Sequence, residues 1–148
     1  MRRLNIGSGQ KPLPDYINLD VDETSFVDIV ADCRQLPFKE NTFDEVYSRA
    51  VLEHISWRET FDVLLEWRRV LKFGGTLIVS VPNWQWLRQQ ERTAWEIVPW
   101  VMGAQRDQYD YHKALFDAPT LKTYFVRLGL NEIEVEDGGF YITARGKK

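Results

Sequence analysis

Residues 4–9 read Leu4-Asn5-Ile6-Gly7-Ser8-Gly9, a short apolar run that ends in two glycines around a serine. Because glycine has no Cβ atom, the backbone at Gly7 and Gly9 can approach a ligand closely. The run predicts a buried strand followed by a turn. In α/β proteins a strand that ends in such a turn begins a nucleotide-type cofactor site.

Two isolated carboxylates follow later apolar runs. Asp20 ends the run at 17–19, and a carboxylate at the end of a second strand can accept hydrogen bonds from both hydroxyls of a ribose. Asp22 is the alternative for that role. Asp32 is then left for an adenine edge, or it caps the turn into the segment 36–38.

Apolar runs alternate with helical patterns along the chain, which indicates an α/β fold with a mostly parallel sheet and helices packed on it. Two apolar runs near the C-terminus, at 132–136 and 140–145, alternate around the turn 137–139 and predict an antiparallel hairpin. The remaining strands are expected at 3–7, 16–20, 27–31, 43–48 and 75–81.

The clearest helix is expected after Ser56, because Ser56 and Glu59 have the spacing of a capping box and Gly74-Gly75 would end it. Its apolar face would contain Phe61, Leu64, Leu65 and Leu71. Another helix is expected over 119–128, begun near Asp117 and stopped by Gly129.

The first crossovers of the sheet are unusually short. Residues 10–16, with Pro12 and Pro14, separate the first two expected strands, and the link from Asp20 to Val27 is equally short. A parallel crossover usually needs about a dozen residues or more, so these crossover helices should be reduced or absent. Pro12 also stands where a dinucleotide fingerprint has its third glycine, which disfavours NAD and FAD.

Bulk composition bounds the remaining choices. The chain has 148 residues, 44% hydrophobic and 28% charged, and is expected to form one domain over 1–148. A net charge of -3 makes nucleic acid an improbable partner. One cysteine and two histidines predict neither a disulfide nor a metal site. No apolar run has the length of a membrane span or a signal sequence, and a cytoplasmic protein is expected.

Five segments in order resemble class I S-adenosylmethionine-dependent methyltransferases of the type 11 kind. They are LNIGSG at 4–9, INLD at 17–20, ADCRQLPF at 31–38, FDEVYSRAVLEHI at 43–55 and EWRRVLKFGGTLIVSVPN at 66–83. The resemblance implies a Rossmann-like methyltransferase fold closed by the C-terminal hairpin, with S-adenosylmethionine as the cofactor. Since this cofactor has no phosphate, a turn with close backbone approach can suffice without a helix N-terminus.

The resemblance also implies cofactor contacts. The turn 7–9, including Ser8, would lie against the amino-acid part of the cofactor. Asp20 and Val21 would contact the ribose. Asp32 and the backbone N–H of Cys33 would contact the adenine. Ser48 would face the methionine end. Arg49 would either pair with the cofactor carboxylate or lie at the surface, and Asn5 stands where many relatives have an acid.

Methyl transfer from a sulfonium is an in-line displacement, so the protein mainly supplies orientation and, where needed, a base for the acceptor. In relatives a histidine before the last helix lies near the acceptor. The resemblance therefore implies His112 as general base or acceptor contact, with Tyr109 and Tyr111 lining the pocket. A hydrogen-bonded loop histidine is the alternative for His112, and His54 is interpreted as structural.

The segment 84–113 is rich in tryptophan, with Trp84, Trp86, Trp95 and Trp100. In the resembling fold this position forms a lid over the acceptor site. An acceptor pocket lined by Trp84, a homodimer contact and ordinary core packing are the open interpretations.

We therefore expect an S-adenosylmethionine-dependent methyltransferase that acts on a small or medium-sized acceptor. The alternative is a non-catalytic module that binds the cofactor or a partner, which the missing crossover helices and Asn5 motivate.

Overall fold

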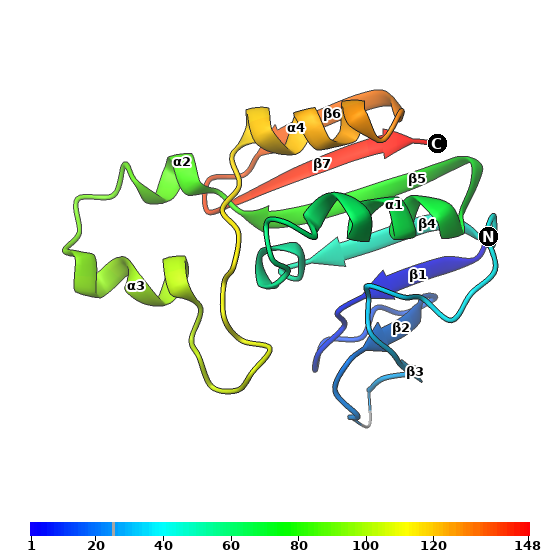
Figure 1. Ribbon diagram of the computed structural model, residues 1–148, viewed down its shortest axis with the longest axis horizontal. Helices are drawn as coiled ribbons and strands as arrows, with labels where there is room; N and C mark the ends of the chain where they lie inside the picture. Colours follow the sequence, from blue (N-terminus) through cyan, green and yellow to red (C-terminus); the bar gives the residue numbers. More distant parts are fainter. Residues whose placement is uncertain (25) are drawn as a thin grey trace.

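One seven-stranded sheet forms the centre of the protein, in the order β3-β2-β1-β4-β5-β7-β6 (Figure 1). The computed structural model describes residues 1–24 and 26–148. The first five strands are parallel, and β7 runs antiparallel between β5 and β6. The expected α/β sheet with a closing hairpin is confirmed. The strands are β1 Arg3–Ile6, β2 Ile17–Asp20, β3 Ile29–Val30, β4 Phe43–Arg49, β5 Leu71–Pro82, β6 Asn131–Asp137 and β7 Tyr141–Lys147.

The helices are short and few. They are η1 Leu52–His54, α1 Thr60–Val70, α2 Trp84–Leu87, α3 Ala94–Met102 and α4 Ala118–Arg127. The longest, α1, lies across β4 and β5, and α4 lies along β6 and β7 (Figure 1). Asp117 caps α4 by accepting from Thr120 N at 2.9 Å, as the sequence predicted. Among the described residues, no helix has the length and apolar character needed to cross a bilayer.

Both α1 and α4 pack on the same face of the sheet. Trp67 of α1 and Phe125 of α4 belong to one buried cluster with Leu4, Val46 and Ile142 of the strands. Successive side chains of a strand point to opposite faces, so the residues between these buried ones lie on the other face. There the sheet carries polar or partly exposed side chains, including Arg3, Glu45, Tyr47, Thr143 and Arg145. The sheet therefore has one apolar face under helices and one polar face.

The predicted loss of the first crossover helices is also confirmed. No helix is found in the described residues between β1 and β3. Asn18 on β2 instead organises the loop at 10–16 through its side chain. Its Oδ1 accepts from Asn5 Nδ2 at 2.9 Å and from Leu13 N at 2.8 Å, while its backbone N donates to Asp28 Oδ2 at 2.7 Å. Asn5, which stands where many relatives have an acid, thus serves to join β1 to β2.

The predicted start and end of α1 were wrong. Glu59 occupies the N-cap position without a side-chain capping bond, and the backbone oxygen of Ser56 accepts from the N–H groups of Glu59 and Thr60. That backbone turn takes the place of the Ser56–Glu59 capping box. A capping box forms elsewhere, between Thr93 and Glu96 at the start of α3.

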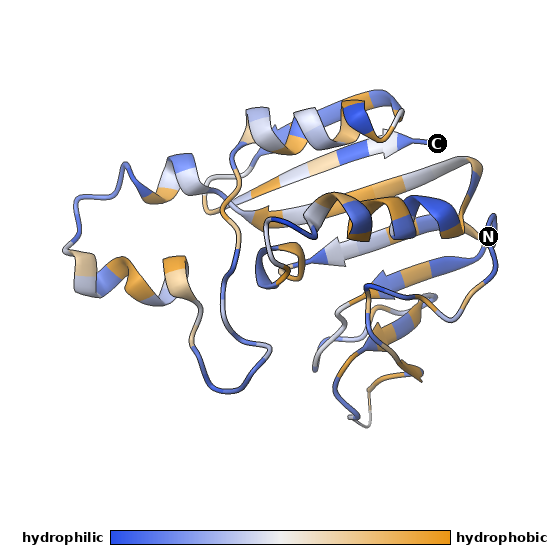
Figure 2. Cartoon of the chain, in the orientation of Figure 1, coloured by the Kyte–Doolittle hydropathy of each residue, from blue (hydrophilic) through white to orange (hydrophobic). Residues whose placement is uncertain are grey.

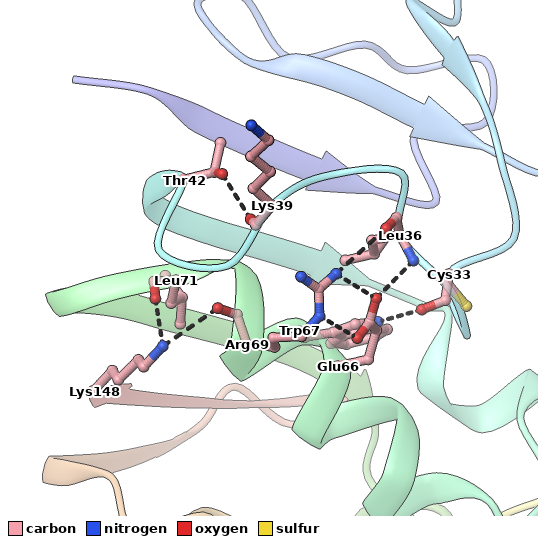
Figure 3. A network of polar contacts seen from close by, with 9 residues as sticks. All are labelled: Cys33, Leu36, Lys39, Thr42, Glu66, Trp67, Arg69, Leu71 and Lys148. Atoms are coloured by element: carbon pink, nitrogen blue, oxygen red, sulfur yellow. Dashed lines mark hydrogen bonds and ion pairs between the residues drawn. The ribbon is translucent and has the colours of Figure 1, made fainter.

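The helix ends at Val70 rather than at Gly74, because neighbouring groups take its last carbonyls. Lys148 Nζ donates to Leu71 O at 2.7 Å and to Arg69 O at 3.3 Å (Figure 3), and Thr42 N donates to Val70 O at 2.8 Å. The chain then enters β5 directly at Leu71, four residues earlier than predicted. The predicted apolar face was wrong at two positions. Leu65 is 41% exposed while Trp67 is fully buried, and Leu71 lies in β5 rather than in the helix.

We predict that Asn18→Ala lowers the free energy of unfolding by about 2–3 kcal/mol, because it leaves buried donors of Asn5 and Leu13 without partners. Urea denaturation followed by circular dichroism measures the change. Asn131→Ala on the exposed start of β6 is the matched control and should change stability by less than about 0.5 kcal/mol. Equal stability of the Asn18 variant and the parent protein would refute this role.

Candidate functional site

A cavity of about 280 Å³ lies at the carboxyl ends of the first three strands. It is bounded by the turn after β1, the end of β2, the loop after β3, the η1 turn and the segment 106–113. The carboxyl ends of parallel strands are where open α/β sheets bind ligands. Of the residues proposed from the sequence, the lining contains Gly7, Gly9, Asp20, Val21, Asp32, Cys33 and Tyr109.

The turn after β1 is held by β2 and by η1. Gly7 N and Ser8 N both donate to Leu19 O, at 2.8 and 3.1 Å. Gly7 has a φ of +73°, and a Cβ atom there would lie 2.0 Å from Val51 Cγ2. Gly9 has a φ of +51°, but a Cβ atom there would meet nothing within 4 Å. Gly7 is therefore required by packing against Val51, and Gly9 leaves open space beside the cavity.

Asp20 joins the end of β2 to this turn. Its Oδ2 accepts from Gly9 N at 2.7 Å, and its Oδ1 accepts from Asp22 N at 3.1 Å. Each carboxylate oxygen keeps a lone pair for a further donor. The carboxylate is thus held in place at the cavity wall with its remaining acceptor sites available to a ligand. Asp22 lines the same wall.

The loop after β3 is fixed by α1. Trp67 Nε1 donates to Cys33 O at 3.0 Å, and Leu36 N donates to Glu66 Oε1 at 2.8 Å (Figure 3). Asp32 accepts from Arg34 N at 2.8 Å and forms an ion pair with Arg34 Nη1 at 3.0 Å. Asp32 therefore closes its own turn and also lines the cavity, and its contact with an adenine stays a prediction.

Cys33 lines the cavity as a thiol. Burial, followed by the nearby Asp32 charge, raises the pKa of Cys33 to about 12. A thiol with such a pKa is almost entirely protonated at neutral pH, and the thiolate is the nucleophilic form. Cys33 therefore shapes the cavity and is chemically inert there.

Some predicted residues lie outside the cavity lining. Ser8 and Ser48 are buried, and within the described part of the chain neither hydroxyl has a hydrogen-bond partner. The Arg49 guanidinium lies over the Tyr141 ring, 4.5 Å from its centroid, which agrees with the surface interpretation of this arginine. Trp84 begins α2, where its N donates to Phe116 O at 2.7 Å.

Two histidines meet beside the cavity, and the predicted His112, like Tyr111, is not among the lining residues. His54 lines the cavity, and its ring lies 4.8 Å from the ring of His112, centroid to centroid, at an interplanar angle of 79°. His54 Nδ1 lies 3.2 Å from Tyr111 O, and His112 Nδ1 lies 2.9 Å from Trp100 O. Burial lowers the pKa of both imidazoles, so both are neutral at pH 7. Sequence reasoning treated His54 as structural and did not foresee this pairing.

Glu53, beside His54, was missed in the sequence. The residue is 2% exposed, and burial raises the pKa of its carboxyl to about 8. The available signal was a charged side chain between Leu52 and Ile55 in an otherwise apolar turn. A buried carboxyl next to a cavity is a candidate functional group.

The tryptophan-rich segment divides into an inner and an outer part. Trp86 and Trp100 pack edge-on against Phe140, each with a ring centroid 5.6 Å from it. On the outside, α3 has no buried residue and Trp95 is 84% exposed. Much of α3 is hydrophobic, and the helix projects away from the sheet (Figure 2). Ordinary core packing therefore does not account for Trp95.

We predict that Gly7→Ala destabilises the protein and deforms the cavity, because the new Cβ atom collides with Val51. The double variant Gly7→Ala with Val51→Ala should recover part of the lost stability, since it removes the colliding methyl group. Gly9→Ala is the control and should cost only about 1–2 kcal/mol for its left-handed backbone. Thermal unfolding measures all three, and equal losses for Gly7→Ala and Gly9→Ala would contradict the prediction.

Comparison with known proteins bears directly on this cavity. A family model for a methyltransferase domain matches residues 8–79. An uncharacterized protein of Methanocaldococcus jannaschii is 44% identical over 63 residues, which are 43% of this chain and 27% of that protein. The match thus spans less than a third of this relative.

Solved structures extend the similarity to the whole fold. A SAM-dependent methyltransferase from Thermotoga maritima has a TM-score of 0.75 and 19% identity, and the match covers 99% of this chain and 82% of that chain. Phosphoethanolamine N-methyltransferase 2 of Haemonchus contortus, in complex with S-adenosyl-L-methionine, has a TM-score of 0.68 and 16% identity, with coverages of 100% and 48%. The methyltransferase-domain match over residues 8–79 and the shared fold together indicate the fold of class I S-adenosylmethionine-dependent methyltransferases, and they support S-adenosylmethionine as the cofactor.

Proposed function

We propose that the protein transfers the methyl group of S-adenosylmethionine to a small or medium-sized acceptor. The observation that carries the proposal is the cavity in which the glycine turn, Asp20 and the Asp32–Cys33 loop meet. These three groups come from the ends of three adjacent parallel strands. Their positions fit a ligand with an amino-acid part, a ribose and a base.

In this proposal each part of the cofactor has its own partner. The turn 7–9 lies against the amino-acid part, where Gly9 leaves open space. Asp20, held by Gly9 N, accepts from the ribose hydroxyls beside Val21. Asp32 and the backbone N–H of Cys33 meet the adenine. Ser48, whose buried hydroxyl lacks a partner among the described residues, is assigned to the methionine end.

The chemical step is an in-line displacement. The acceptor atom attacks the methyl carbon, the carbon–sulfur bond breaks, and its electron pair stays on sulfur as S-adenosylhomocysteine forms. We assign His112 as general base or acceptor contact, because its neutral imidazole lies beside His54 at the cavity wall. Tyr109, which lines the cavity, is assigned to the acceptor pocket. Tyr111 and Trp84 lie outside the lining, in the segment 84–113, and we assign them to the same pocket.

We predict that the intact protein binds S-adenosylmethionine and S-adenosylhomocysteine with micromolar affinity, and that Asp20→Ala weakens both by about tenfold or more. Isothermal titration calorimetry measures the binding. Asp62→Ala, on the exposed side of α1, is the matched control and should bind like the parent protein. Thermal unfolding of each variant separates lost binding from lost structure.

The contrary results are equally informative. Absence of binding by the intact protein would favour the alternative of a partner-binding module. Binding that survives Asp20→Ala but is lost in Asp22→Ala would move the ribose contact to Asp22.

The lone cysteine suits a reducing compartment, and we propose that the protein acts in the cytoplasm.

We further propose that a second copy of the chain covers the outer face of α3. Trp95, Val98 and Met102 have the spacing of one helix face and are 84%, 38% and 47% exposed. In a two-fold dimer the same patch serves both subunits, so an antiparallel pair of α3 helices would set Trp95 against Met102 of the other copy. Such pairing would bury an apolar face that is otherwise open to water.

The dimer proposal predicts that Trp95→Ser shifts the protein to the monomer. Sedimentation velocity over a range of protein concentrations measures the shift. Val126→Ser, which changes another exposed apolar side chain on α4, should leave the association state unchanged. A parent protein that remains monomeric at the highest concentrations would refute this contact.

A further inference from the structure

Three side chains that can bind a metal ion meet beside the cofactor cavity. Glu53 and His54 belong to the η1 turn, and His112 lies in the segment before α4. One potential ligand atom from each lies within 4.8 Å of the other two. The backbone joins the two segments, because Glu53 O accepts from Lys113 N at 2.7 Å and from Ala114 N at 3.2 Å. The cluster is thus fixed from both sides.

The Glu53 carboxyl is only partly compensated by the residues that the structure describes. The residue is 2% exposed, and among the described residues its Oε2 has no hydrogen-bond partner. A buried carboxylate without a partner is costly, and such groups are usually paired or coordinate a metal. The orphaned oxygen therefore points to a missing positive group.

Both histidines have the tautomer in which Nε2 is free to bind a metal ion. Nδ1 of His54 faces Tyr111 O and Nδ1 of His112 faces Trp100 O, so each Nδ1 carries the proton and donates it to a carbonyl. The lone pair of each ring is then on Nε2, which has no hydrogen-bond partner among the described residues. Metal-ligating histidines nearly always donate their other ring N–H in this way.

We propose that Glu53, His54 and His112 bind a divalent transition-metal ion such as Zn²⁺, with an open coordination position toward the cofactor cavity. Imidazole and carboxylate ligands suit this class of ion, and three protein ligands with an open position are typical of catalytic zinc sites. Ligand atoms around tetrahedral zinc lie about 3.3 Å apart. Small side-chain rotations would close the cluster to that spacing. The sequence did not predict this site because Glu53 was not recognised as its third member.

A metal ion at this site would favour one class of methyl acceptor. This part of the inference rests on the proposed methyl transfer. A hydroxyl oxygen bound at the open position has a lowered pKa and releases its proton to solvent. The oxygen then attacks the methyl carbon of the cofactor, and the carbon–sulfur electron pair remains on sulfur. The products are a methyl ether and S-adenosylhomocysteine, so the acceptor is an alcohol or a phenol. His112 would then contact the acceptor through the ion.

The test is metal binding by the untagged, full-length protein after removal of metal with a chelator and dialysis. Calorimetry with Zn²⁺ should give one equivalent bound, and Co²⁺ should give the visible absorption of a low-coordinate site. Glu53→Gln, His54→Gln and His112→Gln should each weaken binding by about 100-fold. Glu91→Gln, an exposed residue of the lid segment, is the matched control and should bind like the parent protein.

Two results of these titrations would overturn the metal site. No stoichiometric binding of Zn²⁺ or Co²⁺ by the parent protein, or binding unchanged in His54→Gln and His112→Gln, would overturn the metal site. Glutamine at position 53 mimics the neutral carboxyl, and the two histidine variants supply independent evidence if the Glu53 variant does not fold. Circular dichroism checks folding in each case.

Titration of the metal-free protein with S-adenosylhomocysteine distinguishes this inference from the proposed function. Cofactor binding without metal binding would leave the methyltransferase proposal intact and end the metal proposal. Metal binding without cofactor binding would do the reverse. Faster methylation of alcohols or phenols than of amines by the zinc-loaded protein supports the acceptor class.

Discussion

In the part of the chain that the structure describes, helices cover only one face of the sheet, and the other features of the structure depend on this constraint. The strands place Leu4, Val46 and Ile142 under α1 and α4 and turn their alternate residues to a polar face. With no crossover helices there, the first strands must be joined by short loops that are held by hydrogen bonds. Asn18 supplies these bonds to β1, to the loop at 10–16 and to Asp28. The side chain and the backbone N–H of Asn18 thus hold together loops that contain no helix among the described residues.

The short loop after β1 also shapes the cofactor cavity. Without a helix N-terminus after β1, the turn 7–9 is held by Leu19 O and by the Asp20 carboxylate. Both are acceptors, so they direct the N–H groups of the turn inward, away from any anion. This arrangement is poorly suited to a pyrophosphate. It suits a cofactor that carries a sulfonium and no phosphate, as S-adenosylmethionine does.

Local features were predictable from the sequence, and long-range ones were not. Strand positions and the hairpin follow from periodicity and turn residues, while Gly7, Asp20 and Asp32 lie at strand ends that the pattern locates. The contact between His54 and His112 depends on how the segment 84–113 returns to η1. Local sequence patterns do not encode that return. The start of α1 was wrong because the backbone oxygen of Ser56 took the bonds expected of its side chain.

The position of β7 between β5 and β6 has a consequence for synthesis. Thr76 through Pro82 of β5 pair with Lys147 through Tyr141, so one edge of a largely buried apolar strand finds its partner only after residues 141–147 have been made. Until then a nascent chain presents that edge unpaired, and unpaired apolar edges promote aggregation. The interval between the synthesis of β5 and that of β7 is therefore when this edge is open to wrong partners.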